Sequence, residues 1–230
     1  MTSHYAIPAP PVPCLPVRNS DDCFPVHRIY CVGRNYADHA VEMGHDPNRE
    51  TPFFFQKNAD NLVTNNGDFP YPASSKEVHH EIELVIAMGN GGTDISRKNA
   101  LNHVWGYAVG LDMTRRDLQS EMKKAGRPWE IGKAFEHSAP CSDAVPASEI
   151  GHPNKGSIRL KVNGEVRQLG NLNQMIWKIP EIITILSGLF ELKPGDLIMT
   201  GTPAGVGAVY QGDLLESFIE GVGEMTTRVV

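Results

Sequence analysis

Two glutamates stand at the entrance to an apolar stretch in the middle of the chain, and this stretch constrains the fold most. Residues 79–89 read HHEIELVIAMG, in which Glu81 and Glu83 precede a run of β-branched and other apolar residues. Such a run is typical of a buried strand. Side chains two positions apart on a strand point to the same face, so we expect the two carboxylates to lie side by side. The fold must therefore either solvate this pair or neutralise it.

A metal ion is one of two interpretations of the pair. Two adjacent carboxylates repel each other unless a proton or a cation lies between them, and burying them unpaired is costly. A hard divalent cation with oxygen ligands would remove the repulsion, either Mg²⁺ or Mn²⁺, with Ca²⁺ as a substitute. The alternative is a solvated strand edge with both glutamates in water. Asp112 is the best third ligand, because it ends a predicted strand over 105–111 just before a helix; its alternative role is to cap that helix.

Composition excludes several classes of protein. The 230 residues are 40% hydrophobic and 21% charged, which is typical of a globular domain. A net charge of −6 without a dense Lys/Arg block argues against a nucleic-acid partner. No apolar run approaches the length of a membrane span, and prolines interrupt the N-terminus, so we expect no signal peptide and a cytoplasmic location. The four cysteines, Cys14, Cys23, Cys31 and Cys141, lack C-x-x-C spacing, so we expect reduced thiols and no zinc site.

Short predicted strands outnumber helices. Residues 1–26 are Pro-rich, and we expect them to lie on the body as an extended arm that is not a packed element. Asn163-Gly164 predicts a type I′ hairpin between 157–162 and 165–168. Further strands are predicted over 27–33, 53–57, 197–200, 213–220 and 223–230, and helices over 37–43, 115–125 (with Thr114 as its N-cap) and 179–190. This pattern favours a β-rich α+β domain, a sandwich or a rolled sheet.

Six motifs follow one another from residue 33 onwards. They are GRNYADH (33–39), HEIEL (80–84), LDMTRRDLQ (111–119), GKAF (132–135), KVNG (161–164) and TGTPAGVG (200–207). In this order they resemble the fumarylacetoacetate hydrolase family, and the resemblance extends from residue 27 to the C-terminus. It is greatest to the acylpyruvate hydrolase branch. The stretches IPAP (7–10) and VHRIY (26–30) are also similar to the fumarylpyruvate hydrolases of gentisate breakdown.

The resemblance implies a fold, an assembly and a metal site. Residues 27–230 would form a fumarylacetoacetate hydrolase-like catalytic domain, a mixed β-sandwich roll, in a homodimer. Glu81, Glu83 and Asp112 would hold Mg²⁺ or Mn²⁺, in agreement with the spacing of the two glutamates. The resemblance also implies a catalytic dyad of His39 and Glu42, and it places a set of polar residues around the ligand: Arg116, Gln119, Lys133, Gly201 and Thr202.

The reaction implied is hydrolysis of the C3–C4 bond of an acylpyruvate, such as fumarylpyruvate to fumarate and pyruvate. The metal would stabilise charge that develops on the 2-oxo oxygen. Glu42 would orient His39, which would take a proton from water. Lys133 and Gln119 are the candidates to donate hydrogen bonds to the oxyanion at C4.

Binding of the substrate carboxylates is assigned less completely. Arg116 and Thr202, with Gly201, suit the carboxylate beside the 2-oxo group. A distal carboxylate, as in fumarylpyruvate, needs a further cation. Three candidates stay open at this point: Arg34, Lys57 and Arg127.

The same residues support other readings. An oxaloacetate decarboxylase would use the metal without water attack, so it would not need the dyad of His39 and Glu42. A 2-oxo-dienoate isomerase or hydratase is a further alternative within the family. A non-catalytic metal-binding scaffold would bind the cation tightly and turn nothing over. The presence of both dyad residues favours hydrolysis.

Overall fold

The computed structural model describes residues 4–37 and 51–230. Its largest sheet has six strands in the order β11-β8-β7-β14-β3-β4. The strands are β3 (Arg28–Gly33), β4 (Phe53–Lys57), β7 (Ile82–Met88), β8 (Val104–Leu111), β11 (Val145–Pro146) and β14 (Asp196–Met199). Only β14 and β3 pair in parallel, so the sheet is mixed. Every residue of β7 is buried, as expected for a central strand with an apolar sequence.

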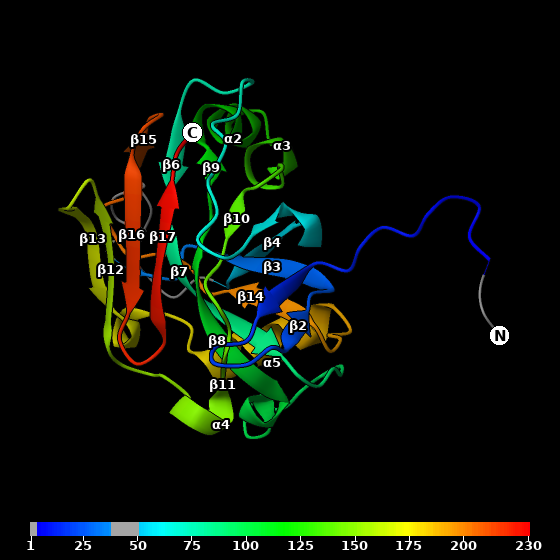
Figure 1. Ribbon diagram of the computed structural model, residues 1–230. Helices are drawn as coiled ribbons and strands as arrows, with labels where there is room; N and C mark the ends of the chain where they lie inside the picture. Colours follow the sequence, from blue (N-terminus) through cyan, green and yellow to red (C-terminus); the bar gives the residue numbers. More distant parts are fainter. Residues whose placement is uncertain (1–3, 38–50) are drawn as a thin grey trace.

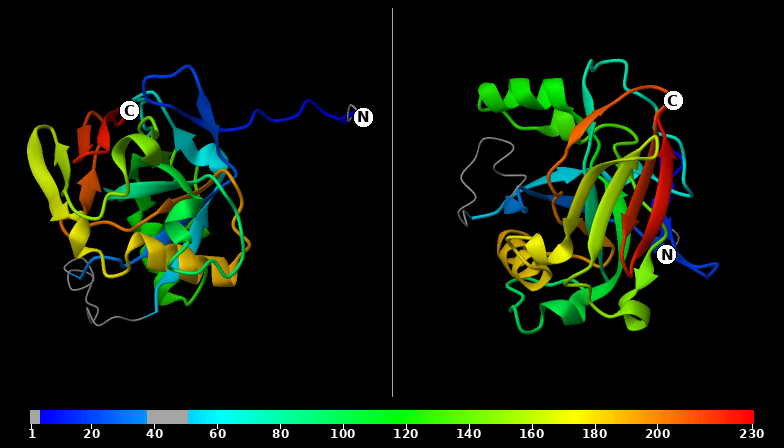
Figure 2. Two further views of the ribbon diagram at one scale, coloured as in Figure 1. Left: turned by 90° about the horizontal axis from the view of Figure 1, so that it is seen from below. Right: turned by 90° about the vertical axis from the view of Figure 1, so that its left-hand side faces the viewer.

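A second, four-stranded antiparallel sheet has the order β13-β12-β16-β17 and lies as a separate layer beside the first (Figures 1 and 2). Its strands are β12 (Ser157–Val162), β13 (Glu165–Asn171), β16 (Leu214–Ile219) and β17 (Gly223–Arg228). Asn163 and Gly164 connect β12 to β13 with φ of 53° and 81°. Both positive angles are those of a type I′ turn, so the predicted hairpin is confirmed.

The third sheet is small and borders the large one. It has the order β15-β6-β9, with β6 (Val78–His80), β9 (Thr114–Arg115) and β15 (Gly207–Val209). Besides these sheets and an N-terminal hairpin, the described residues form a two-stranded β10-β5 pair, four α-helical segments and three short 3-10 segments. Their bounds are β5 (Leu62–Val63), β10 (Ala139–Pro140), α2 (Arg116–Lys124), α3 (Glu130–Lys133), α4 (Ala147–Ile150), α5 (Ile179–Leu189) and 3-10 turns at Ala59–Asn61, Ala100–His103 and Leu172–Gln174. Among the described residues, no helix has the length and apolar character needed to cross a bilayer.

Two apolar clusters cover the two faces of the six-stranded sheet. Leu84 and Ile86 of β7 belong to the larger cluster, which also contains residues of the four-stranded sheet and of α5. Val85 and Ala87, which alternate with them, belong to the smaller cluster. Glu83 precedes Val85 by two positions, so its side chain lies at the end of the smaller cluster. The candidate site therefore begins where this part of the core ends.

The N-terminal arm differs from the expectation. Residues 4–12 are exposed and lead away from the body (Figure 1), but β1 (Cys14–Pro16) and β2 (Cys23–Pro25) pair antiparallel. Leu15 and Phe24 of this hairpin are buried in the smaller cluster. The expectation of an unpacked arm is therefore wrong from Cys14 onwards, because apolar residues alternate with the prolines and cysteines and reach the core.

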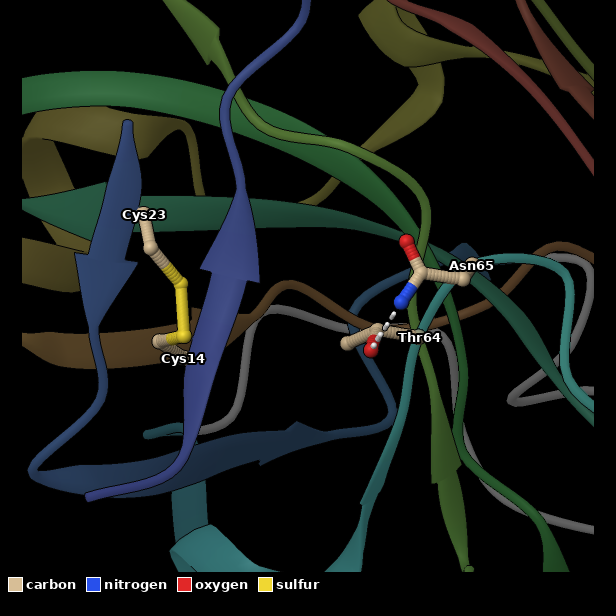
Figure 3. The surroundings of a disulfide bond; sticks show 4 residues. All are labelled: Cys14, Cys23, Thr64 and Asn65. Carbon is tan, nitrogen blue, oxygen red and sulfur yellow. Dashed lines mark hydrogen bonds between the residues drawn. A yellow bond between two sulfur atoms is a disulfide. The ribbon is translucent and has the colours of Figure 1, made fainter. Parts of the chain in front are cut away.

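The expectation of four reduced thiols is also wrong. Cys14 and Cys23 form a disulfide across the β1–β2 hairpin, with 5.8 Å between their Cα atoms (Figure 3). Pairing of the two strands brings these cysteines together although nine positions separate them in sequence. Cys31 and Cys141 are free and buried.

Thr114 does not cap the helix after it, because it belongs to β9, and Arg115 precedes the first residue of α2. The predicted helix over 37–43 lies, apart from Ala37, outside the described residues.

Candidate active site

The three predicted carboxylates converge where the chain passes between two sheets. Glu81 is not inside one continuous strand, as the sequence suggested, but separates β6 from β7. Asp112 separates β8 from β9 in the same way, and its backbone N–H donates to Glu81 O at 2.9 Å. The ligand atoms of Glu81, Glu83 and Asp112 all lie within 4.8 Å of one another, and all three residues are buried.

Burial makes this cluster electrostatically demanding. Burial, followed by the negative charges of Asp112 and Glu81, raises the pKa of Glu83 well above its usual range. The backbone N–H of Gly201 donates to Glu83 Oε2 at 2.6 Å and opposes that shift. No well-directed hydrogen bond from the described residues reaches Asp112 Oδ1, although Lys57 Nζ lies 2.9 Å away as an ion pair. Closely spaced hard oxygens, one of which receives no well-directed hydrogen bond from the described residues, suit a divalent cation.

Lys133 is the cation at the centre of the cluster. It ends the short helix α3, and its Nζ donates to Glu81 Oε2 at 2.8 Å, to Asp112 Oδ2 at 2.7 Å and to Thr114 Oγ1 at 2.7 Å. Burial would lower the pKa of Lys133, but the carboxylates of Asp112 and Glu81 outweigh it and the pKa is raised. Lys133 therefore remains an ammonium ion whose three N–H groups have protein acceptors.

Lys57 lies behind the cluster. Its fully buried Nζ donates to Met113 O at 3.0 Å and to Lys133 O, and pairs with Asp112 Oδ1. These contacts hold Asp112 and the end of α3 in place. The geometry does not support Lys57 as a binder of a distal substrate carboxylate, because protein acceptors surround its ammonium group and it does not line the cavity.

Helix α2 presents Arg116 and Gln119 to the site, one turn apart. The Arg116 guanidinium pairs with Glu81 Oε1 and donates to Gln119 Oε1 at 2.6 Å. Since Arg116 can only donate, the oxygen of the Gln119 amide faces it, and the NH₂ group of Gln119 is directed elsewhere. Arg116 Nε also donates to His79 Nδ1 at 3.2 Å, a contact that sequence reasoning did not predict.

The loop after β14 closes the other side. Gly201 has φ of 92°, and a Cβ atom there would lie 2.7 Å from Asn35 Cβ, so this position requires glycine. Gln168, a fully buried residue of β13 that the sequence did not single out, donates from Nε2 to Thr202 Oγ1 and to Pro203 O, both at 2.8 Å. Its Oε1 accepts from the Ile82 N–H at 3.1 Å and lies 2.9 Å from His80 Nδ1.

A cavity opens over this cluster and extends beyond it. Its lining includes the predicted residues Glu81, Glu83, Asp112, Arg116, Gln119, Lys133, Gly201, Thr202 and Arg34. It also includes residues that the sequence did not single out: Val32, Gly33, Phe53, Phe55, Lys123 and Trp129. Lys123 had a signal in the sequence, because it stands seven positions after Arg116 on the same helical face. His39 and Glu42 lie outside the described residues, so their predicted roles stay predictions.

Comparison with known proteins decides the family. The sequence model of the fumarylacetoacetate (FAA) hydrolase C-terminal domain matches residues 28–230. The chain belongs to the fumarylacetoacetate hydrolase family. The predicted mixed β-rich fold is thereby confirmed, and so is the expectation of a hydrolase that acts on carbon–carbon bonds, at the level of the family.

Within this family several relatives cover nearly the whole chain. The crystal structure of fumarylpyruvate hydrolase from Pseudomonas aeruginosa, in complex with Mn²⁺ and pyruvate, has a TM-score of 0.96 and 53% identity over 99% of each chain. Fumarylpyruvate hydrolase from Ralstonia is 43% identical over 80% of this chain and 95% of its own. The human mitochondrial oxaloacetate tautomerase FAHD1 is 44% identical over 87% and 90%. Mn²⁺ in the first structure and the buried triad here agree with the expected divalent cation.

Proposed function

We propose that this protein hydrolyses the C3–C4 bond of an acylpyruvate, with fumarylpyruvate as substrate and fumarate and pyruvate as products. The observation that carries the proposal is the buried triad of Glu81, Glu83 and Asp112, at the base of a cavity lined by hydrogen-bond donors. The similarity to a fumarylpyruvate hydrolase crystallised with Mn²⁺ and pyruvate supports it, since pyruvate is a product of every acylpyruvate hydrolysis. A homodimer and a role in gentisate breakdown remain predictions from the resemblance, and a cytoplasmic location remains a prediction from the composition of the chain.

The triad residues would hold Mg²⁺ or Mn²⁺, which when bound supplies Lewis acidity toward the 2-oxo oxygen of the substrate. Two of the three triad carboxylates, Glu81 and Asp112, form ion pairs with three cationic side chains: Lys57, Lys133 and Arg116. A divalent ion added to this balanced set leaves the site positive. The site therefore favours an anionic ligand such as a 2-oxo acid.

The donors of the chain suggest how the reacting atoms are held. Gln119 directs its NH₂ group away from Arg116 and is the better donor to an oxyanion at C4. Lys133 would have to exchange one of its three protein acceptors to reach that oxygen. We therefore propose Gln119 as the oxyanion donor, and Lys133 as the cation that pairs with Glu81 and Asp112 and holds them in place.

Hydrolysis divides one water molecule between the two products. Glu42 orients His39, which takes a proton from water as the water oxygen bonds to C4. The C3–C4 electron pair then leaves with the pyruvate fragment, and the proton held by His39 passes to C3 of that fragment. The carbonyl carbon C4 retains the new oxygen and becomes the carboxylic acid.

A specific observation favours a second candidate. The human oxaloacetate tautomerase is as similar in sequence to this chain, at 44% identity over 87% of it, as the Ralstonia fumarylpyruvate hydrolase, at 43% over 80%. Tautomerisation or decarboxylation of oxaloacetate uses the same 2-oxo acid head group without cleavage by water.

One experiment separates these candidates. Purified protein loaded with Mg²⁺ or Mn²⁺ is given fumarylpyruvate, acetylpyruvate and oxaloacetate, while enol absorbance and products are followed. Pyruvate plus a carboxylic acid supports the hydrolase, and His39→Ala should then lose turnover but keep metal binding. Ketonised oxaloacetate as the only product supports a tautomerase, whereas pyruvate plus CO₂ supports a decarboxylase. No turnover of any substrate supports a metal-binding scaffold.

A further inference from the structure

The cavity continues well past the carboxylate triad along helix α2. Arg116, Gln119 and Lys123 occupy positions i, i+3 and i+7 of this helix, and all three line the cavity. Arg116 pairs with Glu81, so this row of three side chains begins at the carboxylate triad. Lys123 stands two turns further on, about 10 Å along the helix axis. The lining face of the helix thus runs from Arg116 at the triad to Lys123, which is exposed at the surface.

A second cation, Arg34, lines the same part of the cavity. Arg34 follows β3 with φ of 58°, a left-handed conformation that non-glycine residues adopt only when their surroundings hold them there. Its guanidinium carbon lies 5.2 Å from the centre of the Phe53 ring. A Cβ atom on the preceding Gly33 would lie 2.0 Å from that ring, so glycine at this position allows Phe53 to pack here. The turn therefore fixes Arg34 above an aromatic wall of the cavity.

The two cations are close enough to influence each other. Partial burial, and then the positive charges of Arg34 and Arg116, lower the pKa of Lys123. Like charges gathered at one end of a cavity favour an anionic ligand there. The ordinary role of Lys123, to complement the negative end of the helix dipole, applies equally to its neighbour Lys124. Of these two lysines, Lys123 lines the cavity and Lys124 does not.

Aromatic rings connect the two charged ends. The rings of Phe53 and Trp129 meet edge to face with 5.1 Å between their centroids, and Phe55 lies 6.0 Å from Trp129. All three residues line the cavity, with the centre of the Phe55 ring 5.0 Å from Lys133 Nζ at the triad and Phe53 beside Arg34. Flat aromatic walls suit a planar, conjugated chain, as in the enol of an unsaturated 2,4-dioxo acid.

We infer that Arg34 and Lys123 form a subsite for a carboxylate at the far end of the substrate, so that the cavity selects long dicarboxylic 2-oxo acids over their monocarboxylic counterparts. This inference rests on the proposed function for the placement of the 2-oxo acid head at the triad. The sequence offered Arg34, Lys57 and Arg127 as candidates to bind a distal carboxylate. In this subsite Arg34 keeps that role, and Lys123 takes the place of Lys57 and Arg127. Lys57 is engaged behind the triad, and Arg127 does not line the cavity.

The test uses two ligands that the protein cannot cleave, because they lack the 4-oxo group. 2-Oxoheptanedioate and 2-oxoheptanoate have equal chain length and the same head, and they differ only in the terminal carboxylate. Each is titrated calorimetrically into the Mn²⁺-loaded protein. We expect the diacid to bind at least ~10-fold more tightly, as one charge-assisted hydrogen bond would provide.

Three variants assign that preference to residues. Lys123→Met and Arg34→Met should each reduce the ratio of the two affinities at least ~5-fold, and the double variant should bring it close to unity. Lys124→Met is the matched control, because Lys124 is the adjacent lysine of the same last turn, and its ratio should stay within ~2-fold of the wild type. Thermal unfolding of Arg34→Met checks that its turn still folds. The ratio remains valid if overall affinity changes, because both ligands share one head.

The outcomes separate this inference from the proposed reaction. A wild-type protein without preference for the diacid, or an unchanged ratio in Lys123→Met, overturns the subsite even if fumarylpyruvate is hydrolysed. A ratio that collapses in Lys123→Met but not in Lys124→Met supports the subsite even if no acylpyruvate is cleaved. In that second case the proposed reaction fails and the selectivity for long diacids stands.

Discussion

At the scale of single residues, Gln168 determines which way the hydroxyl of Thr202 can point. The Pro203 carbonyl can only accept, and the Ile82 N–H can only donate, so the orientation of the Gln168 amide is fixed. Its NH₂ group must then donate to Thr202 Oγ1, whose lone pair is used. The hydrogen of the Thr202 hydroxyl is directed to another acceptor, and Thr202 lines the cavity.

A double-mutant cycle tests this relay. Thr202→Val should weaken binding of a 2-oxo acid by about 1.5–3 kcal/mol, because a hydrogen bond to a charged carboxylate is lost. Gln168→Met should weaken binding in the same direction, and the double variant should be no weaker than Thr202→Val alone. Calorimetry on the Mn²⁺-loaded protein measures all four affinities. Two losses that simply add would mean that Gln168 does not act through Thr202.

Residue identity in the sequence was most informative where the chemistry is local. Two glutamates before an apolar run, and an aspartate after a strand, predicted the acidic cluster that the structure brings together. The contacts of Lys57 and Gln168 could not be predicted, because their partners lie far along the chain. Gln168 accepts a hydrogen bond from the N–H of Ile82, which is 86 positions away. The residues next to either partner in the sequence do not indicate this contact.

At the scale of elements, the junction between sheets places the carboxylates. The sequence predicted one continuous strand through Glu81, but the chain changes sheets there, and Asp112 lies at the corresponding change between β8 and β9. The periodicity of the sequence cannot reveal such a change, because strands of both sheets show the same alternation of side chains between two faces. The Asn163-Gly164 hairpin was predictable because its turn geometry depends on two adjacent residues alone.

The N-terminal hairpin gives a prediction at this scale. Its disulfide joins Cys14 and Cys23, and the strands that it connects bury Leu15 and Phe24. In the chain-entropy account, opening a loop of this length lowers the free energy of unfolding by about 2–3 kcal/mol. Urea unfolding with and without a thiol reductant measures the loss. A variant with both cysteines changed to serine should unfold as the reduced protein does and should not respond to the reductant; an equal response from both proteins would contradict the prediction.

At the scale of the whole molecule, the site joins elements from three sheets and two helices. Glu81 lies between β6 and β7, Glu83 is held by the loop after β14, and Asp112 is held by cations from β4 and α3. A cation at the triad therefore stabilises contacts between segments far apart in sequence. Such a ligand binds the folded chain and not the unfolded one, so the stability of the whole chain is linked to its concentration.

Removal of metal should therefore lower the melting temperature of the entire protein. At a Mn²⁺ concentration about 100 times its dissociation constant, linkage contributes ~2.7 kcal/mol, which corresponds to a rise of about 5–10 °C for a domain of this size. Glu83→Gln should lose at least ~100-fold in Mn²⁺ affinity, since even an outer-shell partner contributes 10–100-fold. The same change removes one of three mutually repelling buried charges, so without metal this variant should melt at or above the wild-type temperature.

Scanning calorimetry with Mn²⁺ and with a chelator measures both effects, and Glu165→Gln serves as the control because that glutamate is exposed on the β12–β13 turn. The control should follow the wild type in both conditions. If Glu83→Gln gained as much from Mn²⁺ as the wild type does, Glu83 would not be a ligand. If Glu83→Gln melted well below the wild type in chelator, the three carboxylates would stabilise one another through hydrogen bonds. The prediction that they repel one another without a cation would then be wrong.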